Sequence, residues 1–294
     1  MTKVKITVFT PTYNRYNNIL NLYHSLQKQT FCNFEWLVID DGSSDGTENL
    51  FEKLLHELNP FQIRYYKFQN CGKQREINRA LDLAKGELFF TVDSDDCLTP
   101  NALYWINEWD TMIPKCGKYC GFAGNDGDLQ GNPINPYSGK SYIDATFFDR
   151  DPHSEKFIGY DRPWVLYTDI HRKYKYPEFE GEKFITEAVV WNRMAADGYM
   201  LRCFDEVIYL IEHQKNGLTD KIHEILVNNP WGYGLWIKEM VEQKNYSWLK
   251  KIKSYYSFYS EMCMYASTGK IAKYVSAGKL EMMLISIVYK LKHG

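Results

Sequence analysis

Residues 88–96, with the sequence LFFTVDSDD, constrain the fold more than any other stretch of the chain. A run of apolar, strand-forming residues ends in three carboxylates within four positions, those of Asp93, Asp95 and Asp96. A buried strand that ends in clustered acids is costly unless positive charge neutralises them. Mg²⁺ and Mn²⁺ prefer oxygen ligands and are often completed by substrate phosphates. The stretch therefore predicts a metal–diphosphate site at the carboxyl end of a sheet strand, with an Asp-rich surface turn as the alternative.

Strand and helix patterns alternate along the first part of the chain. Strands are expected at residues 3–10, 34–39, 63–68 and 87–92, each followed by a helix, the last of which opens after Pro100. This alternation predicts an α/β fold with a mostly parallel central sheet and helices on both faces. Four loops that carry most of the chemistry follow the strands, at residues 12–15, 40–45, 70–75 and 93–96. Because such sheets bind ligands at the carboxyl ends of their strands, these loops are expected to form one site.

The pattern loosens after residue 126. Residues 126–181 are rich in Gly, Pro, Asn and Tyr and predict a loop-heavy segment. A helix is expected at residues 184–196, a strand at 207–211 and a polar loop at 212–220. From about residue 230 to the end the chain is expected to be helical.

Composition and charge narrow the class of protein. The chain has 294 residues, of which 45% are hydrophobic and 24% charged, and this is typical of a globular protein. The net charge of −2 gives no pull towards nucleic acid. Residues 231–294 hold ten Lys and four Glu without Arg or Asp, for a net charge of +6, so the preceding part carries about −8. The basic, Tyr-rich tail is expected to face something anionic.

Seven cysteines at irregular spacings predict reduced thiols and a cytoplasmic location. Cys116 and Cys120 lack a second Cys/His pair at a suitable distance, which argues against zinc. Neither a signal peptide nor an uninterrupted apolar run of membrane-spanning length is expected.

Several segments occur in an order that resembles a known family. They are TVFTPTYNR at residues 7–15, LQKQT at 26–30, FEWLVIDDGSSDGT at 34–47, NCGKQREIN at 70–78 and TVDSDD at 91–96. Together they resemble the family 2 glycosyltransferases with the GT-A fold. GEKFITEAVVWNR at residues 181–193 is similar to the acceptor-side helix of bacterial polysaccharide members. The resemblance covers roughly residues 4–220.

The resemblance implies an inverting transfer of a sugar from a nucleotide-diphosphate donor, with a UDP-sugar preferred. The acceptor would be a saccharide or a lipid-linked saccharide in surface polysaccharide biosynthesis, in the cytoplasm or at the inner face of the membrane. Residues 1–125 would form the nucleotide-sugar half of the GT-A domain and residues 126–225 the acceptor half. Residues 226–294 would form a helical extension.

For the donor site, the resemblance implies that Asp93 and Asp95 form the DxD-type motif. Asp95 would bind Mn²⁺ or Mg²⁺, and Asp93 would bind the ribose or the metal. The remaining donor-site candidates are Pro11, Thr12, Tyr13, Arg15, Asp41, Gly72, Lys73, Asn78 and Ser94, with Arg75 as a further candidate. Tyr13 and Asp41 match positions that hold the base and ribose. The alternatives are that Asp40 or Asp45 only caps a helix and that Lys73 is a solvated cation.

Two positions depart from the family pattern, because Gln74 and Glu76 stand where smaller residues or His are expected. His213 and Lys215, in residues 213–219, resemble the loop that closes over the diphosphate in relatives. Glu187 matches the carboxylate of the acceptor-side motif and is the expected general base. Its runners-up are Glu180, Glu182 and Asp169, and the structural alternative is that Glu187 only begins a helix.

The tail interleaves Lys with Tyr, and two interpretations stay open. One is docking near anionic lipid; the other is a helical appendage that packs on the body or forms a homodimer. The rival functions are a haloacid-dehalogenase-like phosphatase, a nucleotidyltransferase and a non-catalytic sugar-nucleotide-binding module. A phosphatase would leave the Tyr13 and Asp41 loops unexplained. A nucleotidyltransferase usually carries a Gly-rich first loop with a basic residue, which residues 11–15 lack. A non-catalytic module does not account for intact acids at both ends of the site.

Overall fold

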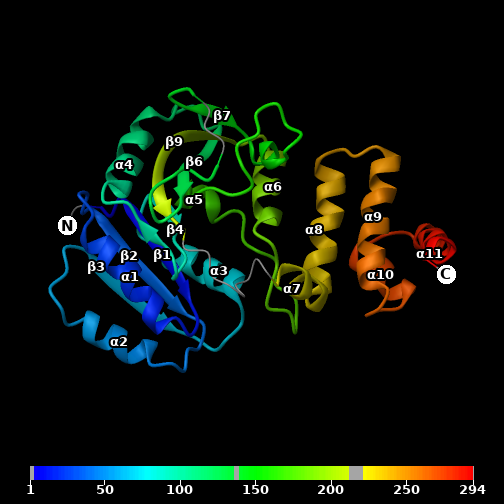
Figure 1. The fold of residues 1–294 in the computed structure, drawn as a ribbon, viewed down its shortest axis with the longest axis horizontal. Helices are drawn as coiled ribbons and strands as arrows, with labels where there is room; N and C mark the ends of the chain where they lie inside the picture. The colour runs from blue at the N-terminus through cyan, green and yellow to red at the C-terminus, as the bar shows by residue number, and fades with distance from the viewer. Residues whose placement is uncertain (1–2, 136–138, 212–220, 294) are drawn as a thin grey trace. The chain divides into compact units, whose positions relative to one another are not determined.

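The computed structural model describes residues 3–135, 139–211 and 221–293, and it divides into two compact units. The first comprises Met1–Lys175 and Asp197–His213, and the second comprises Tyr176–Ala196 and Gln214–Gly294. Figure 1 shows the sheet and its helices in the first unit and a group of helices in the second.

A mixed sheet forms the centre of the first unit. In the described part of the chain it has nine strands in the order β3-β2-β1-β4-β8-β6-β9-β5, with β7 paired to β9. The strands are β1 (Ile6–Thr12), β2 (Phe34–Asp40), β3 (Gln62–Lys67), β4 (Leu88–Thr91), β5 (Cys97–Leu98), β6 (Tyr119–Gly127), β7 (Ile143–Ala145), β8 (Trp164–Tyr167) and β9 (Met200–Leu210). The helices of this unit are α1 (Tyr16–Gln27), α2 (Thr47–Leu54), α3 (Lys73–Leu83), α4 (Ala102–Met112) and α5 (Thr168–His171).

The four strands expected from the sequence are the parallel half of this sheet. β1 lies between β2 and β4, with Val8 opposite Trp36 on one side and Phe90 on the other. β3 pairs in parallel with β2, so the carboxyl ends of all four strands meet at one edge. The α/β fold with a parallel core is therefore confirmed. Beyond β4 the sheet becomes mixed, because β8 runs antiparallel to both β4 and β6.

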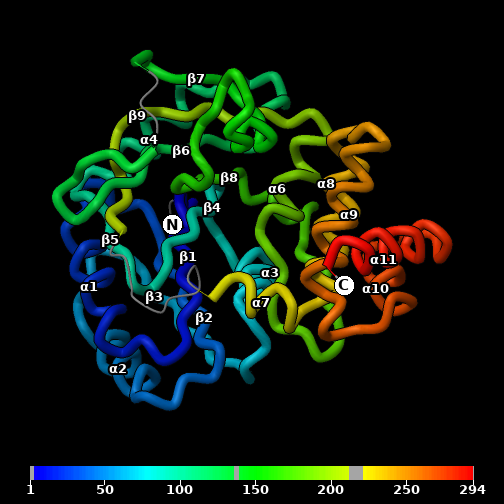
Figure 2. The backbone as a smooth tube through the Cα atoms, turned by 45° about the vertical axis from the view of Figure 1, so that its right-hand side comes forward, coloured from blue at the N-terminus to red at the C-terminus, as the bar shows by residue number. Residues whose placement is uncertain are grey.

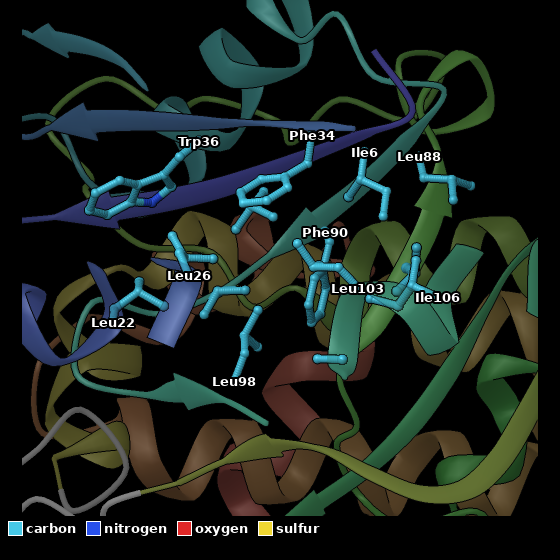
Figure 3. Close-up of a cluster of buried hydrophobic side chains, with 14 of the residues drawn as sticks. Ile6, Leu22, Leu26, Phe34, Trp36, Leu88, Phe90, Leu98, Leu103 and Ile106 are labelled. Carbon is cyan, nitrogen blue, oxygen red and sulfur yellow. The ribbon is translucent and has the colours of Figure 1, made fainter. Parts of the chain in front are cut away.

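Alternating side chains give the parallel half two buried faces. Figure 3 shows one of them, where Ile6, Phe34, Trp36, Leu88 and Phe90 pack against side chains of α1 and α4. Side chains at intervening positions point to the other face, where α3 contacts β1 and β2 and α5 contacts β4 and β8. Strands buried on both faces read as continuous apolar runs, which is why residues 34–39 were recognisable as a strand.

The second half of the first unit was harder to foresee. β6 was not expected from the sequence, because its residues YCGFAGNDG include three glycines and glycine weakens the strand signal. At Gly121 a Cβ atom would overlap the backbone carbonyl oxygen of Val165 on the neighbouring strand, so close backbone packing requires glycine there. β9 begins at Met200, earlier than the expected 207, since its first half pairs with β6 and β7.

The second unit is helical in its described part. It contains α6 (Ala188–Ala196), α7 (Ile222–Asn228), α8 (Pro230–Gln243), α9 (Trp248–Met262), α10 (Thr268–Tyr274) and α11 (Lys279–His293). A helical C-terminal region is thus present, as expected (Figure 2). It has its own buried cluster around Phe258, Ile271 and Met282. The helix expected at residues 184–196 is shorter, because Phe184–Glu187 lead into α6 without helical turns. None of the described helices is long and apolar enough to cross a membrane.

Candidate functional site

The loops that follow the parallel strands are tied together by backbone hydrogen bonds. The Asp41 amide donates to the carbonyl of Thr12 (2.9 Å) and the Phe68 amide to that of Asp40 (2.9 Å). At the fourth strand, the Val92 amide donates to the carbonyl of Phe9 (2.8 Å). The strand ends that lead into the four loops therefore lie next to one another at the edge that is predicted to carry a site.

Asp41 organises the third of these loops. Its Oδ1 accepts a hydrogen bond from the Cys71 amide (2.6 Å), and its Oδ2 accepts one from the Gly72 amide (2.9 Å) and one from Asn70 Nδ2 (3.0 Å). Gly72 has a φ of 98°, a left-handed conformation that favours glycine, immediately before α3 begins at Lys73. The carboxylate thus fixes the backbone that leads into α3, and the Asp41 residue is only 5% exposed.

Glu76 lies beside Asp41 and is almost completely buried. Burial raises its pKa to about 10, and the nearby charges of Asp41 and Asp40 add to the effect. The protonated Glu76 carboxyl donates a hydrogen bond to Asp41. The position where a smaller residue or His was expected therefore holds a neutral acid that contacts the Asp41 carboxylate.

Asp40 and Asp45 serve the local structure. Asp40 is fully buried, and it accepts hydrogen bonds from the Ser43 amide (2.6 Å) and the Tyr65 hydroxyl (2.6 Å). Asp45 accepts from the amide (3.1 Å) and the hydroxyl (2.6 Å) of Thr47 and from the Tyr16 amide (2.9 Å). Asp45 therefore fastens the first turn of α2 to the first turn of α1.

Hydrogen bonds fix the backbone of the loop after β1, whereas the side chain of Tyr13 in this loop is exposed to solvent. β1 continues through Pro11 and Thr12, two residues beyond the expected end at residue 10. Asn14 has a φ of 52°, donates from its amide to Ser43 Oγ (2.8 Å) and accepts at Oδ1 from the Ser44 amide (2.8 Å). Between these fixed points the Tyr13 side chain is 51% exposed, so its ring is available to stack on a planar ligand.

Asp93 and Asp95 each face a cation. Lys73 Nζ lies 2.9 Å from Asp93 Oδ1, and one terminal nitrogen of Arg15 lies 3.6 Å from Asp95 Oδ2. The side chains of Asp93 and Asp95 are 42% and 22% exposed. The structure therefore brings together residues of the first, third and fourth loops, with accessible carboxylates and accessible cations.

Asp96 has a different environment from its two neighbours. The buried Tyr209 hydroxyl donates to Asp96 Oδ2 (2.8 Å) and accepts from the Asp93 amide (3.0 Å). Burial, followed by the charges of Asp93 and Asp96, raises the pKa of Tyr209 well above its usual value. Tyr209 and Asp96 thus fix the backbone of the Asp93–Asp96 turn, in which Ser94 is also buried.

Asp126 is a further acid that the sequence reasoning did not single out. It lies in β6, is 6% exposed and accepts a hydrogen bond from Asn135 Nδ2 (3.3 Å). Burial, then the charge of Asp161, raises its pKa to about 8, and the charge of Asp96 contributes as well. The only sequence signal for this position was a carboxylate next to glycine at the end of a weak strand.

Asp93 and Asp95 offer the oxygen ligands that Mg²⁺ and Mn²⁺ prefer. Among the described residues no group of three His, Cys, Asp or Glu side chains is arranged to hold a metal. Mg²⁺ is commonly bound by one or two carboxylates, with the rest of its shell supplied by substrate phosphates and water. Two accessible carboxylates therefore fit a metal that a bound diphosphate completes.

Some polar atoms near this edge are buried without a partner in the described part of the chain. They are Thr12 Oγ1, both polar atoms of the Gln74 side chain and Glu76 Oε1. Asn78, one turn further along α3, is also buried. Buried polar atoms normally have partners, so this concentration next to the carboxyl edge is consistent with a ligand site.

The acceptor-side candidates lie elsewhere in the chain. Glu187 is half-buried in the second unit, directly before α6, and its carbonyl accepts from the Val190 (3.1 Å) and Trp191 (3.2 Å) amides. Glu182, in the same unit, accepts from the amides of Trp231 (2.7 Å) and Gly232 (2.9 Å), so it caps the start of α8. Asp169, in the first unit, pairs with Arg172, and Glu180 is exposed. His213 and Lys215 lie outside the described residues.

Comparison with known proteins gives a match to a family model over part of the chain and two similar proteins. Residues 7–106 match the model of glycosyl transferase family 2. The GalNAc(5)-diNAcBac-PP-undecaprenol beta-1,3-glucosyltransferase of Campylobacter jejuni is 32% identical over 53% of this chain and 49% of that protein. The poly(ribitol-phosphate) beta-N-acetylglucosaminyltransferase TarS of Staphylococcus aureus is 37% identical over 34% of this chain and 18% of TarS. The chain thus spans about half of the first relative and less than a fifth of the second.

Solved structures extend the likeness in fold to nearly the whole chain. TarS 1–349 of S. aureus in complex with UDP-GlcNAc aligns with a TM-score of 0.62 and 16% identity, over 98% of this chain and 92% of that one. A mannosyltransferase of Pyrobaculum calidifontis in complex with GDP-Man and Mn²⁺ aligns with a TM-score of 0.52 and 16% identity, over 96% and 86%. The motifs, their meeting at one sheet edge and these matches agree: residues 7–106 are similar to glycosyl transferase family 2, and the chain has a GT-A-like fold, as TarS does.

Proposed function

We propose that this protein is an inverting, metal-dependent glycosyltransferase that moves a sugar from a nucleotide-diphosphate donor, with a UDP-sugar preferred. The observation that carries the proposal is the cluster of Asp93, Lys73, Asp95 and Arg15. Accessible acids and accessible bases alternate there at the carboxyl edge of the sheet, which is what binding of a metal together with a diphosphate requires.

In this proposal the first three loops bind the nucleoside. The exposed ring of Tyr13 stacks on the base. Asp41 fixes the backbone at Gly72, and both residues lie against the base and the ribose. Pro11 and Thr12 shape the same pocket. TarS carries UDP-GlcNAc in its structure, and this is the reason for preferring a UDP-sugar here.

Asp95 and Asp93 would hold Mn²⁺ or Mg²⁺, which would stabilise the negative charge that develops on the departing diphosphate. Lys73 and Arg15 supply positive charge at the same place, and Ser94 and Asn78 are proposed as further donor-binding residues. His213 and Lys215 are proposed to close over the diphosphate and so exclude water from an activated sugar.

Glu187 is proposed as the general base that takes the proton from the acceptor hydroxyl. Its rivals are weakened, because Glu182 uses both carboxylate oxygens to cap α8 and Asp169 is paired with Arg172 on the surface. The acceptor is proposed to be a saccharide or a lipid-linked saccharide in bacterial surface polysaccharide synthesis, at the cytoplasmic side of the membrane. The named substrate of the C. jejuni relative is an undecaprenol-linked saccharide, which supports this class.

The test is calorimetric titration of UDP, GDP, CDP and dTDP into the protein, each with and without Mn²⁺. We expect one nucleotide to bind only with metal and Asp95→Ala to lower its affinity more than tenfold, as expected when a charged ligand is lost. Asp82→Ala is the matched control, since Asp82 is an exposed acid that pairs with Lys175. Binding that needs neither metal nor Asp95 would refute the donor site. Tight binding without turnover of any donor would favour a non-catalytic binding module.

A further inference from the structure

The sequence of the basic tail, residues 231–294, suggested a surface of interleaved Lys and Tyr side chains, and the structure shows a different one. The tyrosines expected at an interface are largely internal: Tyr255, Tyr259 and Tyr274 are 3–5% exposed and belong to the core of the second unit. Three of the lysines interleaved with them lie over aromatic rings: Lys250 over Tyr246, Lys251 over Tyr255 and Lys270 over Tyr274. Trp248, Leu249, Met264 and Tyr265 are exposed apolar side chains of this unit, but the longest row of such side chains among its described residues lies on another element.

That element is α11. Its outward side chains Leu280, Met283, Leu284, Ile287, Val288 and Leu291 are between 50% and 82% exposed. They recur at the spacing of one helix face, and they cover it from end to end. The opposite face is buried through Met282 and Ile285 and packs on α9 and α10, as Figures 1 and 2 also show.

A continuous row of six exposed aliphatic side chains is not an ordinary protein surface. Single exposed apolar residues need no explanation, but contiguous ones mark a site of interaction. α11 is already fastened by its buried face, so the row is not needed for its packing. The row therefore indicates a second contact, made by the outward face.

The charges around the row indicate what covers it. By helical geometry Lys279 and Lys290 lie along one border of the row and Lys292 along the other. Glu281 is neutralised by Lys251 at 3.0 Å. The row is thus bordered by lysine, and it belongs to a stretch, residues 231–294, with a net charge of +6. Two copies of so basic a surface repel each other, whereas anionic lipid attracts it.

We propose that the outward face of α11 docks the protein on a membrane surface that contains anionic lipid. Leu280, Leu284, Ile287 and Leu291 would enter the boundary between headgroups and acyl chains, and the bordering lysines would meet lipid phosphates. The helix would lie in the plane of the surface. Such docking would hold the enzyme where a lipid-linked acceptor is presented, although the docking itself does not depend on the proposed glycosyl transfer.

The experiment is flotation of the full-length protein with two kinds of vesicle. One contains phosphatidylcholine alone, and the other contains phosphatidylcholine with about 30% phosphatidylglycerol as the anionic lipid. We expect binding to the anionic vesicles, lowered at least roughly tenfold by the double variant Leu284→Glu/Ile287→Glu. Lys290→Gln and Lys292→Gln should each lower it roughly fivefold. The matched control is Leu58→Glu/Leu129→Glu, which makes the same charge change at exposed leucines of the first unit. Circular dichroism checks that each variant is folded.

Three results would overturn the proposal. One is no binding to anionic vesicles, and another is equal binding by the double variant and the wild type. The third is a dimer in sedimentation equilibrium that Leu284→Glu/Ile287→Glu abolishes while vesicles do not bind; this would assign the face to a second copy of the chain. Nucleotide titration of the same variants separates this question from the proposed function, since docking variants should bind UDP as the wild type does.

Discussion

The ammonium group of Lys73 lies 2.9 Å from Oδ1 and 3.1 Å from Oδ2 of Asp93, so a single cation contacts both oxygens of a carboxylate in the proposed donor site. The two side chains are 26% and 42% exposed. An ion pair this open to solvent contributes only about 0–1 kcal/mol to stability. Its position at the first turn of α3, facing the turn after β4, is better explained by ligand binding.

Replacing Lys73 by Met tests this explanation. We expect affinity for the nucleotide diphosphate to fall by roughly 10- to 100-fold, because a charged hydrogen bond to phosphate is lost. The free energy of unfolding should change by less than about 1 kcal/mol. Lys67→Met is the control, since Lys67 makes a 2.6 Å ion pair with Glu48 on the surface. Calorimetry and urea titration measure the two quantities. Unchanged nucleotide affinity would show that Lys73 is a solvated cation that neutralises Asp93 only.

The buried Glu76 carboxyl makes stability depend on pH. Its pKa is raised from 4.5 to about 10 in the folded protein, so folding retains a proton that the unfolded chain releases above pH 4.5. Stability from this group is complete below that value and is lost as the pH rises towards 10, by at most about 1.4 kcal/mol per pH unit. Glu76→Gln keeps the shape without the titration. We therefore expect the variant to gain stability relative to wild type as the pH rises from 5 to 9.

Urea unfolding at several pH values measures this difference. Comparison at each pH is needed because Asp126, whose pKa is raised to about 8, acts in the same direction in both proteins. Glu52→Gln, at an exposed position of α2, is the matched control and should follow the wild type. A constant difference between Glu76→Gln and wild type across this range would mean that Glu76 does not titrate with a raised pKa in the folded protein, and it would contradict the prediction.

The parallel half of the fold was predictable because each strand there carries its own signal. Ile6 and Val8 alternate with polar positions in β1, and β2 is a run of apolar residues interrupted by Glu35 and ending at Asp40. The loops after these strands were predictable as a site by topology alone, since parallel strands end at one edge. The prediction failed where strands carry weak sequence signals. The main example is β6, in which glycine stands where the backbone of a neighbouring strand approaches closely.

Within the site, the sequence identified accessible groups but not the ones that position them. Tyr209 is 116 residues from Asp93, and nothing in its local sequence indicates that its hydroxyl joins Asp93 to Asp96. The departure at Glu76 was visible, but its consequence depends on burial against Asp41, which requires the packed structure. Asp40 and Asp41 are adjacent residues of the same type, so the sequence does not distinguish their roles. The structure does: Asp40 accepts a hydrogen bond from Tyr65, whereas Asp41 accepts one from the Gly72 amide and fixes that loop.

Glu187→Gln tests the proposed general base. Removing a general base lowers turnover by roughly 10²- to 10⁴-fold, whereas it leaves donor binding unchanged when the base contacts the acceptor only. We expect transfer at saturating donor to fall by this factor and UDP affinity to stay within about twofold of wild type. Activity assays with the donor that the titrations identify, followed by product analysis, measure the first quantity, and calorimetry measures the second.

The control for this test is Glu180→Gln, because Glu180 is an exposed carboxylate in the same unit and only seven residues away. Glu182 would be a poor control, since its neutral amide would weaken the cap of α8 and disturb the helices around it. Substantial transfer by Glu187→Gln, with Glu180→Gln inactive, would reassign the base to Glu180. Loss of transfer and of UDP affinity together in Glu187→Gln would mean that Glu187 supports the structure and does not accept the proton.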